Sequence, residues 1–549
     1  MIVYHCPYTF YCVRDLLLLI RSYIYEEQFM KKIFLNVDKY QYDIHSLFKA
    51  FHGNEDVKVI ISEKVTTETS EKESGFEDAY ATVNIVIKEE TTEYIKGLVQ
   101  VKILIDPKAV ESAEFIDYLN TSKNENISTS GDSSTFDTSK NALKKAIYKA
   151  LVKATGKELP WGNLTGIRPT RIAMNLIDKG KSDSEIYDYM KNTYFVSDEK
   201  IALSISIARR EKDILKEIDY ENGYSLYIGI PFCPTTCLYC SFTSYPIGAY
   251  SKVVDDYISC LEKEIDYVAE NFKEKTLDTI YIGGGTPTTL EPHQIERLIG
   301  YVREKLDCSH VKEFTVESGR PDSITRDKLK AMKKMGVTRI SVNPQTMRDE
   351  TLKLIGRRHT VAQLIDSFNM AREEGFDNIN MDIILGLPGE TAEDVRYTID
   401  EIKKLDPDDL TVHSLAIKRG SRLAEVIHEK ELKGELKVPI MESINNTEEM
   451  MKIAQKGAGD LGLEPYYLYR QKNISGNFEN TGYARPAKAG IYNILINEEV
   501  QSIVALGAGT VTKRVYGNGR IERCDNVKDI KLYMDNIDEM IERKKVLFD

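Results

Sequence analysis

The sequence predicts an α/β protein centred on a parallel partial (β/α)6 barrel, with a small α+β N-terminal domain and a C-terminal α-rich extension. Three observations carry this prediction. From Tyr224, six short apolar runs alternate with amphipathic segments, as β/α units with right-handed crossovers do. Before that point, the chain carries β-rich runs, and the clearest of them alternates with period two. Beyond about Ser443 the β/α period is lost, which indicates a separate C-terminal unit.

The N-terminal domain is predicted over residues 30–120, with strands at Ile33–Val37, Val57–Ser62 and Ala81–Glu89. Residues 121–140 are rich in Ser, Thr and Asn, and we predict a flexible linker because so little apolar surface is available to pack. A helical connector over residues 141–220 follows, and its first helix is expected at Asn141–Thr155. Met30 is an alternative natural start, which would make residues 1–29 an upstream translation artefact.

The barrel is predicted over residues 221–442, and residues 443–549 are expected to form a domain that covers the substrate. Because ligands of such folds bind at the carboxyl ends of the strands, functional residues are expected there. The predicted strands are Ser225–Pro231, Thr279–Gly284, Glu313–Glu317, Arg339–Asn343, Asn380–Leu385 and Leu410–Leu415. The predicted helices are Lys252–Phe272, Pro292–Lys305, Arg326–Met335, Thr360–Glu374 and Thr391–Leu405.

Composition excludes several classes of protein. The formal net charge is −12, so the chain lacks the excess of cations expected of a protein whose main partner is nucleic acid. No run of 18 apolar residues occurs, so no membrane span is expected. Five scattered cysteines fit free thiols in a reducing compartment, which favours the cytoplasm; they are Cys6, Cys12, Cys260, Cys308 and Cys524.

The remaining cysteines, Cys233, Cys237 and Cys240, have the spacing C-x3-C-x2-C just after the first predicted strand. Thiolates are the usual ligands of iron–sulfur clusters, and a 4Fe-4S cube normally takes four. Three cysteines leave one iron open, and the amino and carboxylate groups of S-adenosylmethionine (SAM) can chelate it. The alternatives are a zinc site, for which no fourth ligand is nearby, or three incidental cysteines.

Glycines and polar residues follow the later strands in order. The segment YIGGGTPT, residues 281–288, ends the second strand in three glycines, which let a ligand approach the backbone closely. Glu317 ends the third strand, where a carboxylate can hold ribose hydroxyls. Further candidates lie in or after the remaining strands: Gln345, Arg357, Asp382 and Ala416. Each feature alone is commonly structural, but their joint occurrence in one order supports a SAM-binding cluster.

With these motifs, the sequence resembles the oxygen-independent coproporphyrinogen III dehydrogenases of the radical SAM superfamily, and most closely their HemZ-type branch. The resemblance is specific over residues 224–416 and looser over 141–172 and 460–513. It implies that Cys233, Cys237 and Cys240 bind a 4Fe-4S cluster. The implied SAM contacts are Tyr227, Tyr239, Gly284, Gly285, Thr286, Glu317, Gln345, Arg357, Asp382 and Ala416.

The resemblance also implies a reaction. A reduced cluster would cleave SAM to methionine and a 5′-deoxyadenosyl radical, which would remove hydrogen from the β-carbon of a substrate propionate. Loss of carbon dioxide and one electron would leave a vinyl group, so that coproporphyrinogen III becomes protoporphyrinogen IX. The partners implied are this porphyrinogen substrate and a reducing electron donor such as flavodoxin or ferredoxin.

A tetracarboxylate substrate requires cations to hold it. Lys418, Arg419, Arg470 and Lys472 are candidate anchors, and Tyr466, Tyr467 and Tyr469 are candidates for an apolar wall. Solvated surface charges and core aromatics are the competing interpretation of these residues. Trp161, the sole tryptophan, is either a packed loop anchor or a contact to the barrel.

Two departures from the family pattern leave the substrate open. The well-characterised dehydrogenases carry a further cysteine two residues after the third, where this chain has Phe242, and they lack the acidic N-terminal unit. Phenylalanine at that position is shared with relatives that resemble haem chaperones. The histidine–asparagine signature of those chaperones is not evident in the C-terminal region, where residues 465–484 take its place. A haem-binding chaperone and a radical SAM enzyme with another substrate therefore remain alternatives.

Overall fold

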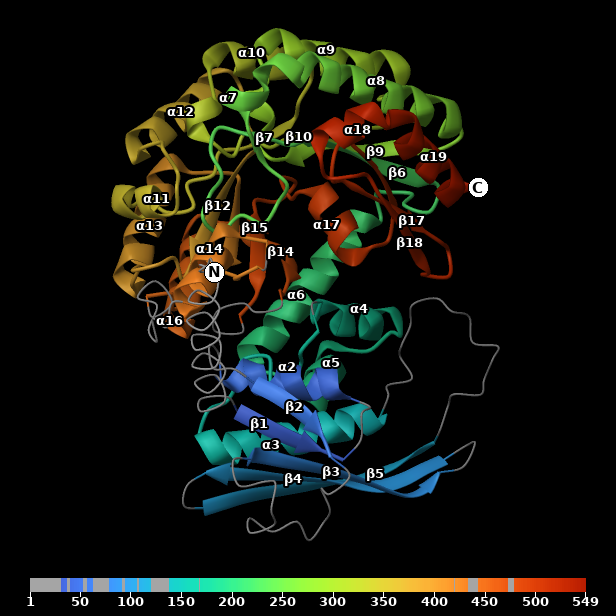
Figure 1. Ribbon diagram of the computed structural model, residues 1–549, viewed down its shortest axis with the longest axis vertical. Coiled ribbons are helices and arrows are strands. Elements are labelled where there is room, and N and C mark those ends of the chain that lie inside the picture. Colours follow the sequence, from blue (N-terminus) through green and yellow to red (C-terminus); the bar gives the residue numbers. More distant parts are fainter. Residues whose placement is uncertain are drawn as a thin grey trace, which may run out of the picture.

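The computed structural model describes residues 31–36, 40–52, 57–62, 79–90, 94–105, 108–119, 138–166, 168–418, 420–432, 443–471 and 478–549. Residues 1–29 and most of the predicted linker lie outside these ranges. The described chain has two lobes, a small one built on the N-terminal sheet and a large one built on a sheet wrapped by helices (Figure 1). Within the described residues, no helix is long and apolar enough to cross a membrane.

The small lobe is a five-stranded sheet with two helices packed on it. Its strand order is β2-β1-β3-β4-β5, with β1 parallel to both neighbours and the β3-β4-β5 part antiparallel. Apolar side chains of β1, α2 and α3, among them Ile33, Phe48 and Leu151, form its core. The elements are β1 (Lys31–Leu35), α2 (Gln41–His52), β2 (Val57–Ile61), β3 (Ala79–Glu90), β4 (Tyr94–Ile105), β5 (Lys108–Leu119) and α3 (Thr138–Thr155).

Three helices connect the lobes: α4 (Thr170–Asp178), α5 (Asp183–Tyr194) and α6 (Asp198–Leu215). Helix α5 begins at a capping box in which Ser182 and Glu185 satisfy each other's backbone N–H groups. The Trp161 indole is fully buried near these helices, and its Nε1 donates a 2.7 Å hydrogen bond to Glu479 of the large lobe. Trp161 is therefore both a packed loop anchor and a contact to the barrel unit.

Six parallel strands form the predicted partial barrel. They are consecutive neighbours in the order β13-β12-β11-β10-β9-β6, and each pair is parallel. The sequence prediction of six strands is confirmed, and the bounds differ by only a few residues. The strands are β6 (Gly223–Ile230), β9 (Thr276–Gly284), β10 (Glu313–Val316), β11 (Arg339–Ser341), β12 (Ile379–Leu385) and β13 (Asp409–Ser414).

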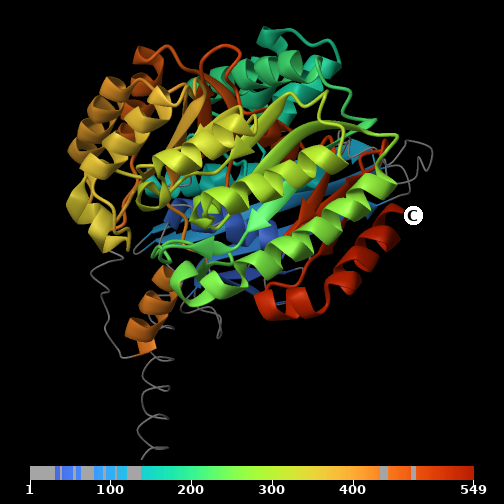
Figure 2. The same cartoon turned by 90° about the horizontal axis from the view of Figure 1, so that it is seen from above.

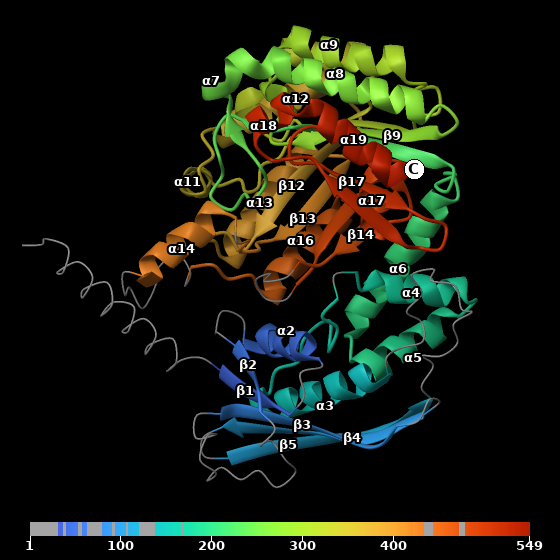
Figure 3. The same cartoon turned by 45° about the vertical axis from the view of Figure 1, so that its right-hand side comes forward.

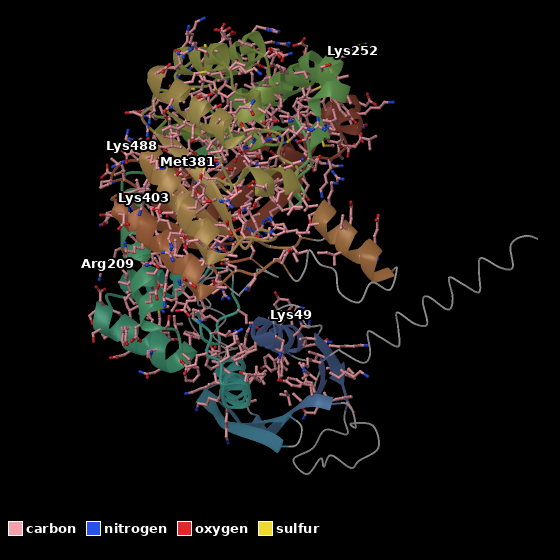
Figure 4. The ribbon with its side chains drawn as sticks, turned by 90° about the vertical axis from the view of Figure 1, so that its left-hand side faces the viewer. Lys49, Arg209, Lys252, Met381, Lys403 and Lys488 are labelled. Atoms are coloured by element: carbon pink, nitrogen blue, oxygen red, sulfur yellow. The ribbon has the colours of Figure 1, made fainter. Side chains whose placement is uncertain are left out.

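Amphipathic helices cover the outer face of this sheet. Seen from above in Figure 2, α8, α9 and α10 lie side by side over it. Figure 4 shows Met381 of β12 inside the helical layer and Lys403 of α13 at its outer surface. The main helices are α8 (Val254–Asn271), α9 (Pro292–Lys305), α10 (Arg326–Lys334), α12 (Val361–Glu373) and α13 (Ala392–Leu405), with short α7 (Ile247–Tyr250) and α11 (Asp349–Leu354) and the later α14 (Arg422–Leu432).

The residues after 443 extend the barrel sheet at both edges, which the loss of the β/α period did not predict. Strands β15 and β14 continue the sheet beyond β13 in antiparallel fashion, while β16 pairs in parallel with β6 and leads to β17 and β18 (Figures 1 and 3). The elements are α16 (Glu448–Asp460), β14 (Glu464–Tyr469), β15 (Asn480–Ala484), α17 (Ile491–Glu498), β16 (Ser502–Leu506), β17 (Val511–Val515), β18 (Ile521–Asp525), α18 (Ile530–Asp535) and α19 (Ile537–Phe548).

A buried ion pair fastens the C-terminal helix to the barrel. Lys544 of α19 donates a 2.6 Å hydrogen bond to Glu264 of α8, and both side chains are fully buried. The other Glu264 oxygen accepts hydrogen bonds from the Tyr533 hydroxyl at 2.5 Å and the Gly507 amide at 2.7 Å. Asn526 donates to Glu264 and accepts from Lys544, so the pair is well satisfied.

Candidate active site

A cavity of about 790 Å³ lies at the carboxyl ends of the barrel strands. The three clustered cysteines line it, and so does every side chain or glycine that the sequence analysis named as a cofactor contact. This placement follows from the parallel sheet, because all six strand ends face the same edge. The lining cofactor candidates are Tyr227, Tyr239, Gly284, Gly285, Thr286, Glu317, Gln345, Arg357, Asp382 and Ala416.

The cysteine loop follows β6 and is docked onto the segment after α11. The backbone N–H of Leu238 donates to the carbonyl of Ile355 at 2.9 Å, and the Thr235 hydroxyl donates to the Gly356 carbonyl at 3.1 Å. Gly356 has a left-handed φ of 79°, and a Cβ there would stand 3.4 Å from the Thr236 carbonyl. These contacts hold the loop over one end of the cavity.

Polar groups of the barrel reach the thiols. Burial raises the pKa of the Cys233 thiol to about 11, and a 3.4 Å hydrogen bond from the Thr286 hydroxyl opposes that shift. Arg320 lies 3.6 Å from the Cys237 sulfur and is fixed by its pair with Asp322 at 2.7 Å. The sequence analysis did not name Arg320, although its place just after the third strand was a usable signal.

The triple-glycine turn allows β9 to approach the cysteine loop closely. A Cβ at Gly285 would stand 2.7 Å from the Phe232 carbonyl and 3.0 Å from the Cys233 sulfur, so no larger residue fits without displacement. Gly284 has a φ of 106°, a conformation open mainly to glycine. Backbone hydrogen bonds from Gly285 to Ile230 and from Thr286 to Phe232 complete the junction.

Glu317 stands just after β10 and is half-buried at the cavity wall. Its carboxylate accepts hydrogen bonds from the Tyr281 hydroxyl at 2.6 Å and from the Gly284 amide at 3.3 Å. Burial raises the pKa of Glu317 to about 7, and these hydrogen bonds limit the rise. The ring of Tyr281 is stacked on Tyr227 at 6.0 Å and on Tyr492 of α17 at 4.4 Å, between ring centroids. Tyr492 lines the cavity as well and was missed by the sequence analysis.

Asp382 occupies the middle of β12. Asn343 and Asn380 donate to its two oxygens at 2.7 and 2.8 Å, and the Nε2 atom of His413 lies 3.9 Å away. Burial opposes ionisation, but His413 and these polar neighbours outweigh it and hold the pKa of Asp382 below its usual range. Asp382 therefore faces the cavity as a carboxylate.

Gln345 and Arg357 are held by backbone groups of the neighbouring strands. Gln345 has a φ of 65°, unusual for a residue with a side chain, and its backbone N–H donates to the Asp382 carbonyl while its carbonyl accepts from the Ile384 N–H, both on β12. The Arg357 guanidinium donates to the carbonyls of Asn343 at 2.7 Å and Gly319 at 3.1 Å. Both residues are thereby fixed at the cavity wall.

The predicted substrate anchors have different outcomes. Lys418 lines the cavity, and its ammonium lies 5.3 Å from the ring centroid of Phe242, which is 66% exposed. Arg419 and Lys472 lie outside the described residues.

Arg470 is buried but is not among the cavity-lining residues. Its guanidinium donates to the Leu164 carbonyl at 2.8 Å and lies 5.9 Å from the Trp161 ring centroid, on the connector side. Tyr467 and Tyr469 of β14 line the cavity, and so does Gln471, whereas Arg470, the first residue after β14, does not. Arg470 therefore does not line this cavity, and its predicted contact with the substrate stays a prediction. Tyr466 also points away, donating a 2.8 Å hydrogen bond to buried Asp409.

The donor set fits an iron–sulfur cluster with SAM. Within the described ranges, no group of three or more His, Cys, Asp or Glu side chains is preformed as a cage for a metal ion. One loop nevertheless carries three thiols to one end of the cavity, and thiolates are the ligands that such clusters take. Next to them lie glycine backbone groups and two carboxyl side chains, Glu317 and Asp382, which suit the polar parts of a nucleoside and an amino acid.

Comparisons with known proteins give the family. Residues 227–402 match the radical SAM superfamily. The chain is 39% identical over 410 residues to the oxygen-independent coproporphyrinogen-III oxidase-like protein HemZ of Bacillus subtilis, which covers 74% of this chain and 80% of that protein. It is 36% identical over 245 residues to the heme chaperone HemW of Bacillus subtilis, covering 44% of this chain and 62% of that protein.

The solved structure of coproporphyrinogen III oxidase HemN from Escherichia coli is also similar, with a TM-score of 0.46 and 23% identity over 60% of this chain and 73% of that chain. Radical SAM enzymes use a 4Fe-4S cluster and SAM. The extended similarity to HemZ shows that the chain belongs to the HemZ-type family of radical SAM enzymes.

Proposed function

We propose that this chain catalyses the oxygen-independent oxidative decarboxylation of coproporphyrinogen III, converting two propionate side chains to vinyl groups and giving protoporphyrinogen IX. The names of the relatives support this proposal, since HemZ is described as coproporphyrinogen-III oxidase-like and a protein of Escherichia coli, 34% identical over 196 residues, as an oxygen-independent coproporphyrinogen III oxidase. The observation that carries it is that one cavity joins the cysteine loop to a wall of tyrosines.

In the proposal, Cys233, Cys237 and Cys240 hold the cluster, and the strand-end residues hold SAM. The bound cluster and SAM supply the one-electron chemistry that removes hydrogen from the substrate. Glu317 would accept hydrogen bonds from ribose hydroxyls, and Asp382 would receive a donor of the amino-acid part. The Gly284–Thr286 backbone offers N–H and C=O groups to the polar end of the ligand.

The rest of the cavity would receive the substrate. Tyr467 and Tyr469 lie nearly parallel, with ring centroids 6.2 Å apart and 9° between the ring planes, and form an aromatic wall. Lys418 at the cysteine loop would bind one of the substrate carboxylates. A reducing protein such as flavodoxin or ferredoxin would deliver the electron to the cluster.

A haem-binding chaperone is the second candidate function, and one observation favours it. Phe242 stands where the dehydrogenases carry a further cysteine, and its exposed ring at the cavity offers an apolar surface to a flat macrocycle. Matches to HemW proteins over part of their length are consistent with this alternative. A radical SAM enzyme acting on another substrate is the third.

One anaerobic assay separates these candidates. Reconstituted protein would be incubated with coproporphyrinogen III, SAM, a chemical reductant and an electron acceptor, and vinyl products, carbon dioxide and 5′-deoxyadenosine would be measured. The proposal expects two equivalents of carbon dioxide for each protoporphyrinogen formed. Formation of 5′-deoxyadenosine without any vinyl product would favour another substrate. Stoichiometric haem retention without turnover would favour the chaperone.

A further inference from the structure

One imidazole on the cavity wall has no part in the proposed binding of the cluster, SAM or the substrate. His413 lies on β13 and lines the cavity, with its side chain partly exposed to it. The Nε2 atom lies 3.9 Å from Oδ1 of Asp382, and the Nδ1 atom lies 3.5 Å from the hydroxyl of Tyr469. The imidazole thus bridges the Asp382 side of the cavity and the tyrosine wall.

Both contacts of His413 are longer than a good hydrogen bond, whose donor and acceptor lie about 2.7–3.2 Å apart. The hydroxyl of Tyr469 is likewise only loosely held, by the Gln471 amide at 3.4 Å. The two polar groups converge on one part of the cavity while neither is saturated by a protein partner at close range. A ligand oxygen placed between the imidazole of His413 and the hydroxyl of Tyr469 could form a hydrogen bond of ordinary length with each of them.

Four arginine and lysine side chains of the cavity wall are better engaged by the protein. Arg320 pairs with Asp322 at 2.7 Å, and Arg339 pairs with Asp409 at 3.0 Å. Lys513 of β17 pairs with Glu499 at 3.2 Å, and Arg357 donates to two backbone carbonyls. Among the residues that the structure describes, His413 and Lys418 therefore remain as the cavity-facing basic groups best placed to receive carboxylates of a substrate.

The position of the tyrosine wall depends on a glycine of the intervening strand. Strand β15 lies between β13 and β14, and Gly482 pairs with Thr411 on one side and with Tyr467 on the other. A Cβ at Gly482 would stand 1.9 Å from Cε1 of Tyr467, so the ring crosses β15 where no side chain stands. This crossing extends the aromatic wall toward β13, the strand that carries His413.

We propose that His413 and Tyr469 together bind a propionate carboxylate of the substrate, and that Asp382 positions the imidazole for this contact. This inference rests on the proposed function and deepens it, because it assigns a carboxylate subsite to residues that no motif indicated. Lys418, near the cysteine loop, would receive a second carboxylate of the same macrocycle. The subsite takes the place that the sequence had suggested for Arg470.

Binding of coproporphyrin III, the stable oxidised form of the substrate, tests the subsite without turnover. Its fluorescence would be titrated against reconstituted wild-type protein and against the variants His413→Phe and Tyr469→Phe. Loss of a hydrogen bond to a charged group should weaken binding roughly ten-fold in each variant. The tetramethyl ester, which lacks carboxylates, should bind wild type and variants alike.

Three controls separate a subsite from a general disturbance. His310→Phe changes an exposed histidine and Tyr397→Phe an exposed tyrosine, both on other elements, and each should bind like wild type. SAM affinity should change by less than three-fold in Tyr469→Phe, which keeps the ring. In turnover, His413→Gln should raise KM while retaining more of kcat/KM than His413→Phe.

The outcomes divide clearly. Wild-type affinity of both variants for coproporphyrin III would overturn the subsite and leave the proposed function standing. Equal weakening of the ester and the acid would also overturn it, because the defect would not involve a carboxylate. Wild-type protein that neither binds nor decarboxylates the tetracarboxylate overturns the proposed function, and the subsite with it.

Discussion

The Tyr281 hydroxyl donates a 2.6 Å hydrogen bond to the carboxylate of Glu317, joining the second and third strands of the barrel at the cavity. The ring of Tyr281 packs against Tyr227 and Tyr492, which also contact each other with ring centroids 6.2 Å apart, so a cluster of three aromatic rings holds the tyrosine that binds Glu317. Burial in this setting raises the pKa of Glu317 to about 7. The relationship gives one carboxyl group both a fixed position and a titration near neutral pH.

The first prediction concerns SAM affinity as a function of pH. A carboxylate accepts hydroxyl hydrogen bonds better than a carboxylic acid does, so SAM affinity should rise as pH increases through about 7. Glu317→Gln should lower the affinity at pH 8 roughly ten-fold and flatten this dependence. Isothermal titration with reconstituted protein between pH 6 and 8.5 measures both effects. An identical pH profile in wild type and variant would contradict the assignment of Glu317.

The second prediction concerns how the stability of the unliganded chain depends on pH, and it follows from the same raised pKa of Glu317. Because the folded pKa of Glu317 lies above its ordinary value of 4.5, the folded protein binds the proton more tightly than the unfolded chain does. Its contribution to the free energy of unfolding is complete below pH 4.5 and is lost as pH rises to about 7. Denaturant titrations should show that the free energy of unfolding falls less between pH 5 and pH 7.5 in Glu317→Gln than in wild type.

The third prediction tests the cysteine loop. Anaerobically reconstituted wild type should hold about four irons for each chain, and Cys237→Ala should abolish cluster assembly. Cys308→Ala removes a cysteine that does not line the cavity, and it should reconstitute normally. Iron and sulfide analysis, with electron paramagnetic resonance after reduction, gives the measurement. If the triple variant of Cys233, Cys237 and Cys240 still holds the wild-type content of iron and sulfide, the proposed ligand set is wrong.

The fourth prediction concerns the glycine turn. Gly285→Ala places a methyl group 2.7 Å from the Phe232 carbonyl and 3.0 Å from the Cys233 sulfur, so the cysteine loop must shift. Cluster content should therefore fall, although no ligand is changed. Gly248→Ala is the matched control, since a Cβ there meets nothing within 4 Å. Full cluster content in Gly285→Ala would show that the loop tolerates displacement.

The sequence predicted the barrel well because both of its signals are local. Apolar runs and helical periodicity depend on neighbours in the chain, and all six strands and their helices appeared where the pattern placed them. The rule that ligands bind at the carboxyl ends of parallel strands then predicted that the candidates from Tyr227 to Ala416 would lie together, and they line one cavity. The roles of those residues stay predictions until they are measured.

Non-local features were not predictable in the same way. The pairing of β16 with β6 joins residues almost 280 positions apart, and no local sequence pattern predicts it. The side that Arg470 faces depends on the register of a short strand, where a shift of one residue reverses every side chain. His413 was missed because its significance comes from Asp382 and Tyr469 on other strands. Strands β4 and β5 of the small lobe were also not predicted.

A fifth prediction concerns the attachment of the C-terminal helix. Lys544→Met leaves the Glu264 carboxylate buried without its cation, which should lower the free energy of unfolding by about 3–5 kcal/mol. Lys545→Met breaks only a surface pair with Glu542 and should change it by about 0–1 kcal/mol. Urea denaturation of the two variants compares the adjacent lysines directly. Equal midpoints would mean that the buried pair adds nothing beyond packing.

The final prediction follows from the orientation of Arg470. Its guanidinium donates to the Leu164 carbonyl beside Trp161, so its removal should loosen the junction between the connector and the large lobe. Arg470→Met keeps most of the side-chain volume but removes the hydrogen bond to Leu164, and it should lower the midpoint of urea denaturation. Coproporphyrin III affinity of the folded variant should stay within about three-fold of wild type, because Arg470 does not line the cavity. A loss of porphyrin affinity as large as that of His413→Phe, with stability unchanged, would return Arg470 to the substrate site. Measuring both quantities on one preparation is essential, since a partly unfolded variant would lose affinity for a trivial reason.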